Sequence, residues 1–177
     1  MNEIRLHDKI FVPFISADEI SRAVRRLARQ VRKDVTDNPV FITVLKGGFV
    51  FAADFAKHYD GPAEFDFIRV KSYRNTQSSG IVEILLDITA DIRDREIYVL
   101  EDIVDTGNTL GTILDMIYKH RPKSVKIVSL FFKPEAYKKD YPVHFVGLEI
   151  PNKFIVGYGL DYNELGRNLK DVYQLKT

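Results

Sequence analysis

At residues 97–110 the chain reads IYVLEDIVDTGNTL. The apolar run Ile97–Leu100 predicts a buried strand that ends in two adjacent carboxylates, Glu101 and Asp102. A Thr-Gly turn then opens a helix expected over Thr109–His120. Because a helix N-terminus presents free backbone N–H groups and the positive end of the helix dipole, this turn is typical of a phosphate-binding site.

A third carboxylate, Asp105, stands between the acid pair and the turn. Three carboxylates would repel a phosphate unless they have another task. Carboxylates accept hydrogen bonds from sugar hydroxyls and hold Mg²⁺, so the combination predicts a site for a sugar phosphate. Taken singly, each acid or hydroxyl is better explained as a helix cap, whereas the complete pattern favours function. The nucleotide motifs G-x-x-x-x-G-K-[ST] and G-x-G-x-x-G are absent from the sequence.

Strand-like and helix-like segments alternate along the chain, which predicts an α/β fold with a mostly parallel sheet. Ser16 and Glu19 have the spacing of a capping box at the start of a helix. A further helix is expected over 49–58, and strands over 40–45, 63–70, 81–88, 124–132, 143–150, 154–158 and 172–175. Three loops follow such strands, after Leu45, Leu100 and Phe132, and parallel sheets bind ligands at that edge.

The chain of 177 residues carries 26 Lys and Arg, 25 Asp and Glu, 45% hydrophobic residues and no Cys. These values predict one globular domain, residues 1–177, and exclude disulfides, iron–sulfur clusters and a Cys nucleophile. A net charge of +1 gives no general reason to expect a nucleic-acid partner. No apolar run approaches the roughly 18 residues of a membrane span, and the first ten residues do not read as a signal peptide. A cytoplasmic protein is therefore expected.

The first predicted helix has one strongly basic face, and apolar residues recur at helical spacing on the other. The basic face could contact RNA or an anionic membrane, but its sparse aromatic content favours a solvated outer surface. The basic residues are Arg22, Arg25, Arg26, Arg29, Arg32 and Lys33.

Residues 98–110 resemble the phosphoribosyl pyrophosphate (PRPP) motif of type I phosphoribosyltransferases. The resemblance extends to the hypoxanthine-guanine branch of that family, because further motifs follow in the same order along most of the chain. They are Leu45-Lys46-Gly47-Gly48, the loop that opens with Ser72-Tyr73, Lys133 after a strand, and Phe154-Ile155-Val156-Gly157 followed by Asp161-Tyr162. The resemblance implies the type I phosphoribosyltransferase fold: a mostly parallel, twisted sheet flanked by helices. Its core would span about 35–135, and the N-terminal segment and about 143–177 would form a small hood.

The same resemblance implies purine salvage, in which the phosphoribosyl group of PRPP passes to hypoxanthine or guanine with Mg²⁺ as cofactor, giving IMP or GMP and pyrophosphate. Glu101 and Asp102 would bind the ribose hydroxyls and Mg²⁺. Asp105 would also be the general acid/base for a purine ring nitrogen. The residues expected at the 5′-phosphate are Asp105, Thr106, Gly107, Asn108 and Thr109. Asn108 stands where many relatives carry a basic residue, a difference expected to alter PRPP affinity rather than activity.

Resemblance also assigns the pyrophosphate end of the site and a closing loop. Asp161 would hold a second Mg²⁺ carried by pyrophosphate, and in the family the peptide bond before the lysine of the Lys-Gly-Gly loop can be cis. The residues expected at pyrophosphate are Lys46, Gly47 and Arg167. The polar segment Ser72–Gly80 resembles the mobile loop of the family, in which Ser72 and Tyr73 would help to exclude water.

Purine recognition is expected from Lys133 and from residues near the end of the chain. Lys133 would donate to the 6-oxo group and disfavour adenine, because an ammonium has no acceptor for an exocyclic amine. Phe154 would stack on the base, and the backbone near Ile155 and Asp161 would read its edge. Since backbone groups do most of that reading, the choice among hypoxanthine, guanine and xanthine stays open. The resemblance implies a homodimer or homotetramer, and the sequence does not decide between them.

Two other functions fit parts of the sequence. Asp105-Thr106-Gly107 is also the aspartic-protease triplet, but that fold is all-β and the triplet here opens a predicted helix. The second alternative is a regulator that keeps the PRPP site and binds RNA through the basic helix. The retained Asp105, Lys133 and Phe154 favour the enzyme.

Overall fold

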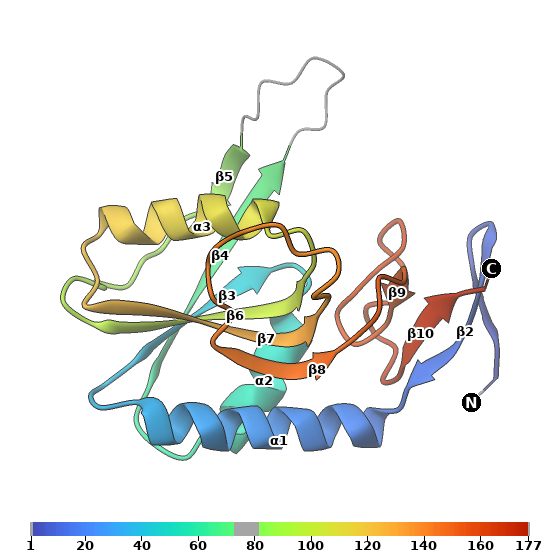
Figure 1. Ribbon diagram of the computed structural model, residues 1–177, viewed down its shortest axis with the longest axis horizontal. Helices are drawn as coiled ribbons and strands as arrows, with labels where there is room; N and C mark the ends of the chain where they lie inside the picture. The colour runs from blue at the N-terminus through green and yellow to red at the C-terminus, as the bar shows by residue number, and fades with distance from the viewer. Residues whose placement is uncertain (1, 73–81, 177) are drawn as a thin grey trace.

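The computed structural model describes residues 2–72 and 82–176, and their strands form two sheets of different size (Figure 1). The larger sheet contains β3 (Val40–Leu45), β4 (Glu64–Ser72), β5 (Val82–Leu86), β6 (Glu96–Val104), β7 (Ser124–Phe132) and β8 (Phe145–Glu149). The smaller sheet, which we call the hood, contains β1 (Ile4–Leu6), β2 (Lys9–Ile15), β9 (Ile155–Val156) and β10 (Val172–Leu175). The helices are α1 (Ala17–Asp34), α2 (Phe49–His58) and α3 (Asn108–Lys119).

The larger sheet has the order β5-β4-β3-β6-β7-β8 and is parallel except for the antiparallel edge strand β5. Helices α1 and α2 cover one face and α3 covers the other (Figure 1). Both faces of the sheet are apolar because helices cover both. In β3, Phe41 packs with α1 and α2, whereas Val40 and Ile42 pack with α3. The predicted α/β fold with helices flanking a mostly parallel sheet is confirmed.

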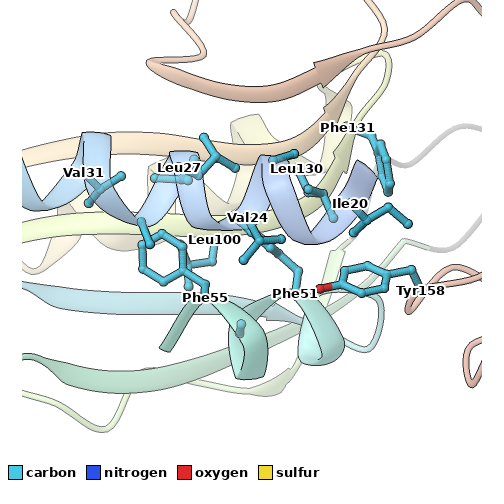
Figure 2. Close-up of a cluster of buried hydrophobic side chains, with 14 of the residues drawn as sticks. Ile20, Val24, Leu27, Val31, Phe51, Phe55, Leu100, Leu130, Phe131 and Tyr158 are labelled. Atoms are coloured by element: carbon cyan, nitrogen blue, oxygen red, sulfur yellow. The ribbon is translucent and has the colours of Figure 1, made fainter. Parts of the chain in front are cut away.

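Helix α1 forms where the capping signal predicts it. The Ser16 side chain accepts a hydrogen bond from the Glu19 backbone N–H at 3.3 Å. The apolar stripe, which includes Ile20, Val24 and Leu27, is buried against the sheet and α2 (Figure 2). All six basic residues of the opposite face are exposed, as predicted for an outer surface.

Strand β6 is longer than predicted. It continues through the acid pair to Val104, because its pairing with β7 extends to Val104 opposite Phe132. Glu101 and Asp102 therefore lie within the strand, where the sheet fixes their backbone. The helix α3 also begins one residue earlier than expected, at Asn108.

The hood is built from both ends of the chain, which lie together in Figure 1. Strand β2 pairs with β10, so residues about 160 positions apart become neighbours. Two details differ from the expected ranges of about 35–135 for the core and 143–177 for the hood. Strand β8 pairs with β7 in the larger sheet, and α1 packs on that sheet, so both belong with the core. Among the described residues, no helix is long and apolar enough to cross a membrane.

Glu96 ties the start of β6 to the end of α1, and its charge is expected to make stability depend on pH. It accepts hydrogen bonds from the Thr36 backbone N–H and from Lys123, both at 3.0 Å, and from the Thr36 hydroxyl. Burial raises the pKa of Glu96, but these bonds outweigh it and lower the pKa to about 2. Because the folded-state pKa lies below the unfolded one, the stabilisation is present above about pH 4.5 and is lost as pH falls towards 2.

The expected result is that wild-type unfolding free energy falls between pH 5 and 2 by about 2–3 kcal/mol more than that of Glu96→Gln. Urea titrations across this pH range measure it. The exposed pair Glu3–Lys176 supplies a control, Glu3→Gln, that should leave the slope unchanged. Equal slopes in wild type and Glu96→Gln would contradict the assignment.

Candidate active site

A cleft of about 340 Å³ lies between the carboxyl ends of β3, β6 and β7 and the hood. These three strands are neighbours in the sheet, so the loops that follow them meet at one edge. Of the residues proposed from the sequence, those that line the cleft are Gly47, Glu101, Asp102, Asp105, Thr109, Lys133, Phe154, Ile155, Asp161 and Arg167. Thr106, Gly107 and Asn108 line an adjoining hollow of about 90 Å³ together with Glu101, Asp105 and Thr109.

The remaining proposed residues lie elsewhere. Lys46 stands at the rim of the cleft, where its ammonium contacts a hood carboxylate. Ser72 is the last residue of β4. Tyr73 falls outside the described residues, as does most of the proposed closing loop.

The acid pair lies side by side in β6, with Asp102 buried and Glu101 half-buried. Burial, and then the neighbouring Asp102, raise the pKa of Glu101 well above its ordinary value. Burial also raises the pKa of Asp102 to about 6, although the Ile103 backbone N–H and the charge of Arg167 oppose it. One oxygen of Glu101, Oε2, is buried without a hydrogen-bond partner in the part of the chain described. Such a pair is suited to a ligand that brings hydroxyl donors or a cation.

The residues present fit a magnesium ion that keeps water and substrate oxygens as ligands. Mg²⁺ is commonly held by one or two carboxylates plus phosphates, and Glu101 and Asp102 supply two carboxylates with an unused oxygen. Within residues 2–72 and 82–176, no cluster of three or more His, Cys, Asp or Glu side chains is arranged to hold a metal. The protein alone therefore offers a partial coordination sphere.

The loop at 105–109 between β6 and α3, which we call the cradle, has a backbone suited to an anion. Gly107 is the N-cap residue of α3 and has φ +79°, in the left-handed region that favours glycine. A Cβ at this position would also come within 2.6 Å of the Tyr137 ring. The first turn of α3 contains no acidic residue, so no carboxylate within the helix offsets the positive end of its dipole.

Asp105 and Lys133 meet directly in the cleft. The Lys133 ammonium lies 2.8 Å from Oδ2 of Asp105. The lysine side chain is buried, with 7% exposure, whereas Asp105 is 43% exposed. The Lys133 backbone N–H also donates to the Val104 carbonyl at 3.0 Å, which fixes the residue beside β6. A buried ammonium paired with a half-exposed carboxylate can donate and accept protons or hydrogen bonds towards the same ligand.

Phe154 projects from an aromatic group in the hood. Its ring meets Tyr162 edge-on at a centroid distance of 5.9 Å and lies 6.2 Å from the ring of Phe11. The side chain remains 47% exposed where it lines the cleft, so one surface is open to a planar ligand. The next residue, Ile155, is buried in β9.

The turn after β9 brings charged groups to the Lys-Gly-Gly loop. Arg167 pairs with Asp161 at 2.6 Å and donates to the Gly159 carbonyl at 2.8 Å. A Cβ at Gly47 would lie 1.8 Å from Oδ2 of Asp102, so only glycine fits between this loop and the acid pair. The Leu45–Lys46 peptide bond is cis.

Comparison with known proteins places this arrangement in a family. The family model described as phosphoribosyl transferase domain matches residues 16–163. The chain is 42% identical over 173 residues to hypoxanthine-guanine phosphoribosyltransferase of Streptococcus pneumoniae R6, covering 97% of this chain and 96% of the relative. It is 43% identical over 164 residues to the protein of that name in Bacillus subtilis, covering 92% and 91%. The chain belongs to the phosphoribosyltransferase family.

A solved structure has the same fold as this phosphoribosyltransferase. A hypoxanthine-guanine phosphoribosyltransferase from Bacillus anthracis, with HEPES in the active site, superposes with a TM-score of 0.88 at 40% identity. The match covers 93% of this chain and 98% of that one. The chain is therefore a glycosyl-transferring enzyme. The aspartic-protease alternative is wrong, because residues 105–107 lead from a parallel strand into α3.

Sequence reasoning missed two parts of this phosphoribosyltransferase site. It did not single out Glu164, whose carboxylate contacts Lys46 beside the cleft. It also gave no role to Phe11 and Tyr162, which support the Phe154 ring. A signal was present for Glu164, which stands between Asp161 and Arg167, but its partner lies 118 positions earlier in the chain.

Proposed function

We propose that this phosphoribosyltransferase acts in purine salvage and transfers the phosphoribosyl group of PRPP to hypoxanthine or guanine. The observation that carries the proposal is one cleft that holds an acid pair, the Lys133–Asp105 pair and an exposed Phe154 ring, with the cradle at 105–109 lining the hollow beside it. The names of the relatives from Streptococcus pneumoniae and Bacillus subtilis support the same substrates. A homodimer or homotetramer stays a prediction.

PRPP would lie along the edge of the larger sheet. The cradle at 105–109 receives the 5′-phosphate, because the start of α3 favours an anion there. The ribose hydroxyls donate to Glu101 and Asp102, which supplies a hydrogen bond to the Glu101 Oε2 atom that has no partner among the described residues. The pyrophosphate group lies towards Lys46 and Arg167. Mg²⁺, when bound, offsets the negative charge of pyrophosphate and so makes it a better leaving group.

The reaction exchanges one bond for another at the sugar C1 atom. A purine ring nitrogen forms the new bond while the bond from C1 to the pyrophosphate oxygen breaks, and pyrophosphate keeps the electron pair. The proton of that ring nitrogen passes to the carboxylate of Asp105. Positive charge develops on the sugar, and the neighbouring carboxylates favour it over the ground state.

The cleft also accounts for selection of the base. The Lys133 ammonium donates to the 6-oxo group of the purine, and the Phe154 ring stacks on its face. Adenine presents an amine at this position, and the buried lysine has no acceptor for it. Because the Lys133 side chain is only 7% exposed, water cannot readily replace the missing hydrogen bond. Hypoxanthine, guanine and xanthine all carry this 6-oxo group, and the turnover assay described next measures their relative rates.

A turnover assay with PRPP and Mg²⁺ tests the proposal. Adenine, hypoxanthine, guanine and xanthine are offered separately, each with and without a chelator. We expect nucleotide formation from the 6-oxopurines, none from adenine, and loss of activity with the chelator. PRPP binding without turnover of any base would overturn the proposal. It would also favour a regulator, for which salt-sensitive RNA binding by α1 is the next measurement.

A further inference from the structure

A hood carboxylate sits among the cations proposed to bind pyrophosphate. The Lys46 ammonium lies 2.9 and 2.8 Å from the two oxygens of Glu164. Arg167 approaches the same carboxylate to 3.8 Å. A hydrogen bond and charge from Lys46, with the charges of Arg167 and Arg69, hold the pKa of Glu164 below its ordinary value. Glu164 therefore lies where an anionic ligand of these cations would lie.

The fold of the hood delivers Glu164 to this position. Its backbone N–H donates to Oδ2 of Asp161 at 2.8 Å, and its φ of +68° turns the chain sharply. The segment that leads into this turn packs closely against the Lys-Gly-Gly loop. The approach is so close that a Cβ added at Gly159 would lie 2.2 Å from the Gly47 carbonyl oxygen. The Glu164 side chain is 67% exposed, so it can swing into solvent without disturbing the packed hood.

We propose that Glu164 is a built-in competitor of pyrophosphate, holding Lys46 until the pyrophosphate group of PRPP displaces it and returning as the product leaves. This inference rests on the proposed function, which gives Lys46 and Arg167 to pyrophosphate. Two anions cannot share the same ammonium closely without repulsion, so the Glu164 carboxylate weakens binding of pyrophosphate and of PRPP. The same carboxylate does not affect the binding of a nucleotide that carries no pyrophosphate group.

The expected effect is moderate because the ion pair is exposed to solvent. Replacing Glu164 by Gln keeps the shape of the side chain and removes its charge. We expect Mg-pyrophosphate and PRPP to bind about two- to fivefold more tightly to Glu164→Gln than to wild type. The affinity for IMP, whose phosphate occupies the cradle at 105–109, should change less than about twofold.

Isothermal titration calorimetry of the full chain measures these affinities with Mg-pyrophosphate, PRPP and IMP as separate ligands. Glu3→Gln is the matched control, because it breaks the exposed pair Glu3–Lys176 of the hood, at 2.7 Å, without touching the cleft. A second variant, Glu164→Asn, suits the positive φ and also removes the charge. Melting curves establish that each variant is folded. Tighter pyrophosphate binding in both Glu164 variants, with IMP unchanged, supports the proposal.

Two results would overturn it, and they differ from failure of the proposed function. Equal pyrophosphate affinity in wild type and both variants would make Lys46–Glu164 an ordinary surface pair. Weaker binding in the variants would show that Glu164 supports the loop around Lys46. If wild type bound neither pyrophosphate nor PRPP, the proposed function itself would fail, and the competitor role with it.

Discussion

Asp105→Asn is expected to lower kcat by about 10²- to 10⁴-fold, the usual contribution of a general base. Asparagine keeps an oxygen that can accept from Lys133, whose ammonium lies 2.8 Å from Oδ2 of Asp105. It cannot take the proton of the purine ring nitrogen. The backbone of the cradle is unchanged, so KM for PRPP should move much less than kcat. Steady-state kinetics with hypoxanthine and PRPP measure both constants.

The control for this substitution is Asp115→Asn. Asp115 is exposed on α3, the helix that Asp105 precedes, and lies outside the cleft. The Asp115→Asn variant should keep wild-type kinetics. If Asp105→Asn retained kcat within about threefold while its melting temperature was unchanged, Asp105 would serve only to pair Lys133, and proton transfer would need another acceptor.

Gly47→Ala should reduce kcat/KM for PRPP by about 100-fold or more. The new methyl group would stand 1.8 Å from Oδ2 of Asp102 and 2.6 Å from its carboxyl carbon, so either the loop or the acid pair must move. Displacing reacting groups by about 1 Å can by itself cost about two orders of magnitude in rate. The loss should fall on PRPP, because Asp102 and the loop at Gly47 are proposed to contact its sugar and pyrophosphate.

Gly111→Ala gives the comparison for this prediction. Gly111 lies inside α3, and a Cβ there meets only the end of the Tyr141 side chain, at 3.2 Å. Alanine favours a helix over glycine, so this variant should keep its activity and melt at the same or a higher temperature. Equal kinetics for Gly47→Ala and wild type would show that the loop has room to move and that its close approach to Asp102 has no role.

Local sequence determined most of the elements of the core. The bounds of β3, α2 and β7, and of the hood strand β10, coincide with the predicted ranges, because apolar runs and their breaks are local signals of hydrogen-bonded segments. The cradle was predictable for the same reason: the Thr-Gly turn at 106–107 and the helix after it are adjacent in the chain. The sequence predicts β6 in the right place but ends it too early, at Leu100, because its last residues are held by pairing with β7.

Tertiary structure alone decided how the hood strands pair and which charged groups meet in the site. No strand is predicted from the sequence over β1 or β2, although β2 contains the apolar run IFVPFI, which Pro13 interrupts. Strand β2 belongs to the hood because β10 returns beside it from the other end of the chain. The contact of Lys46 with Glu164 joins positions 118 apart, and that of Asp105 with Lys133 joins positions 28 apart. Residue types predicted the chemistry each group can perform, whereas strand order and hood packing determined which groups meet, because side-chain contacts follow distance in space rather than along the chain.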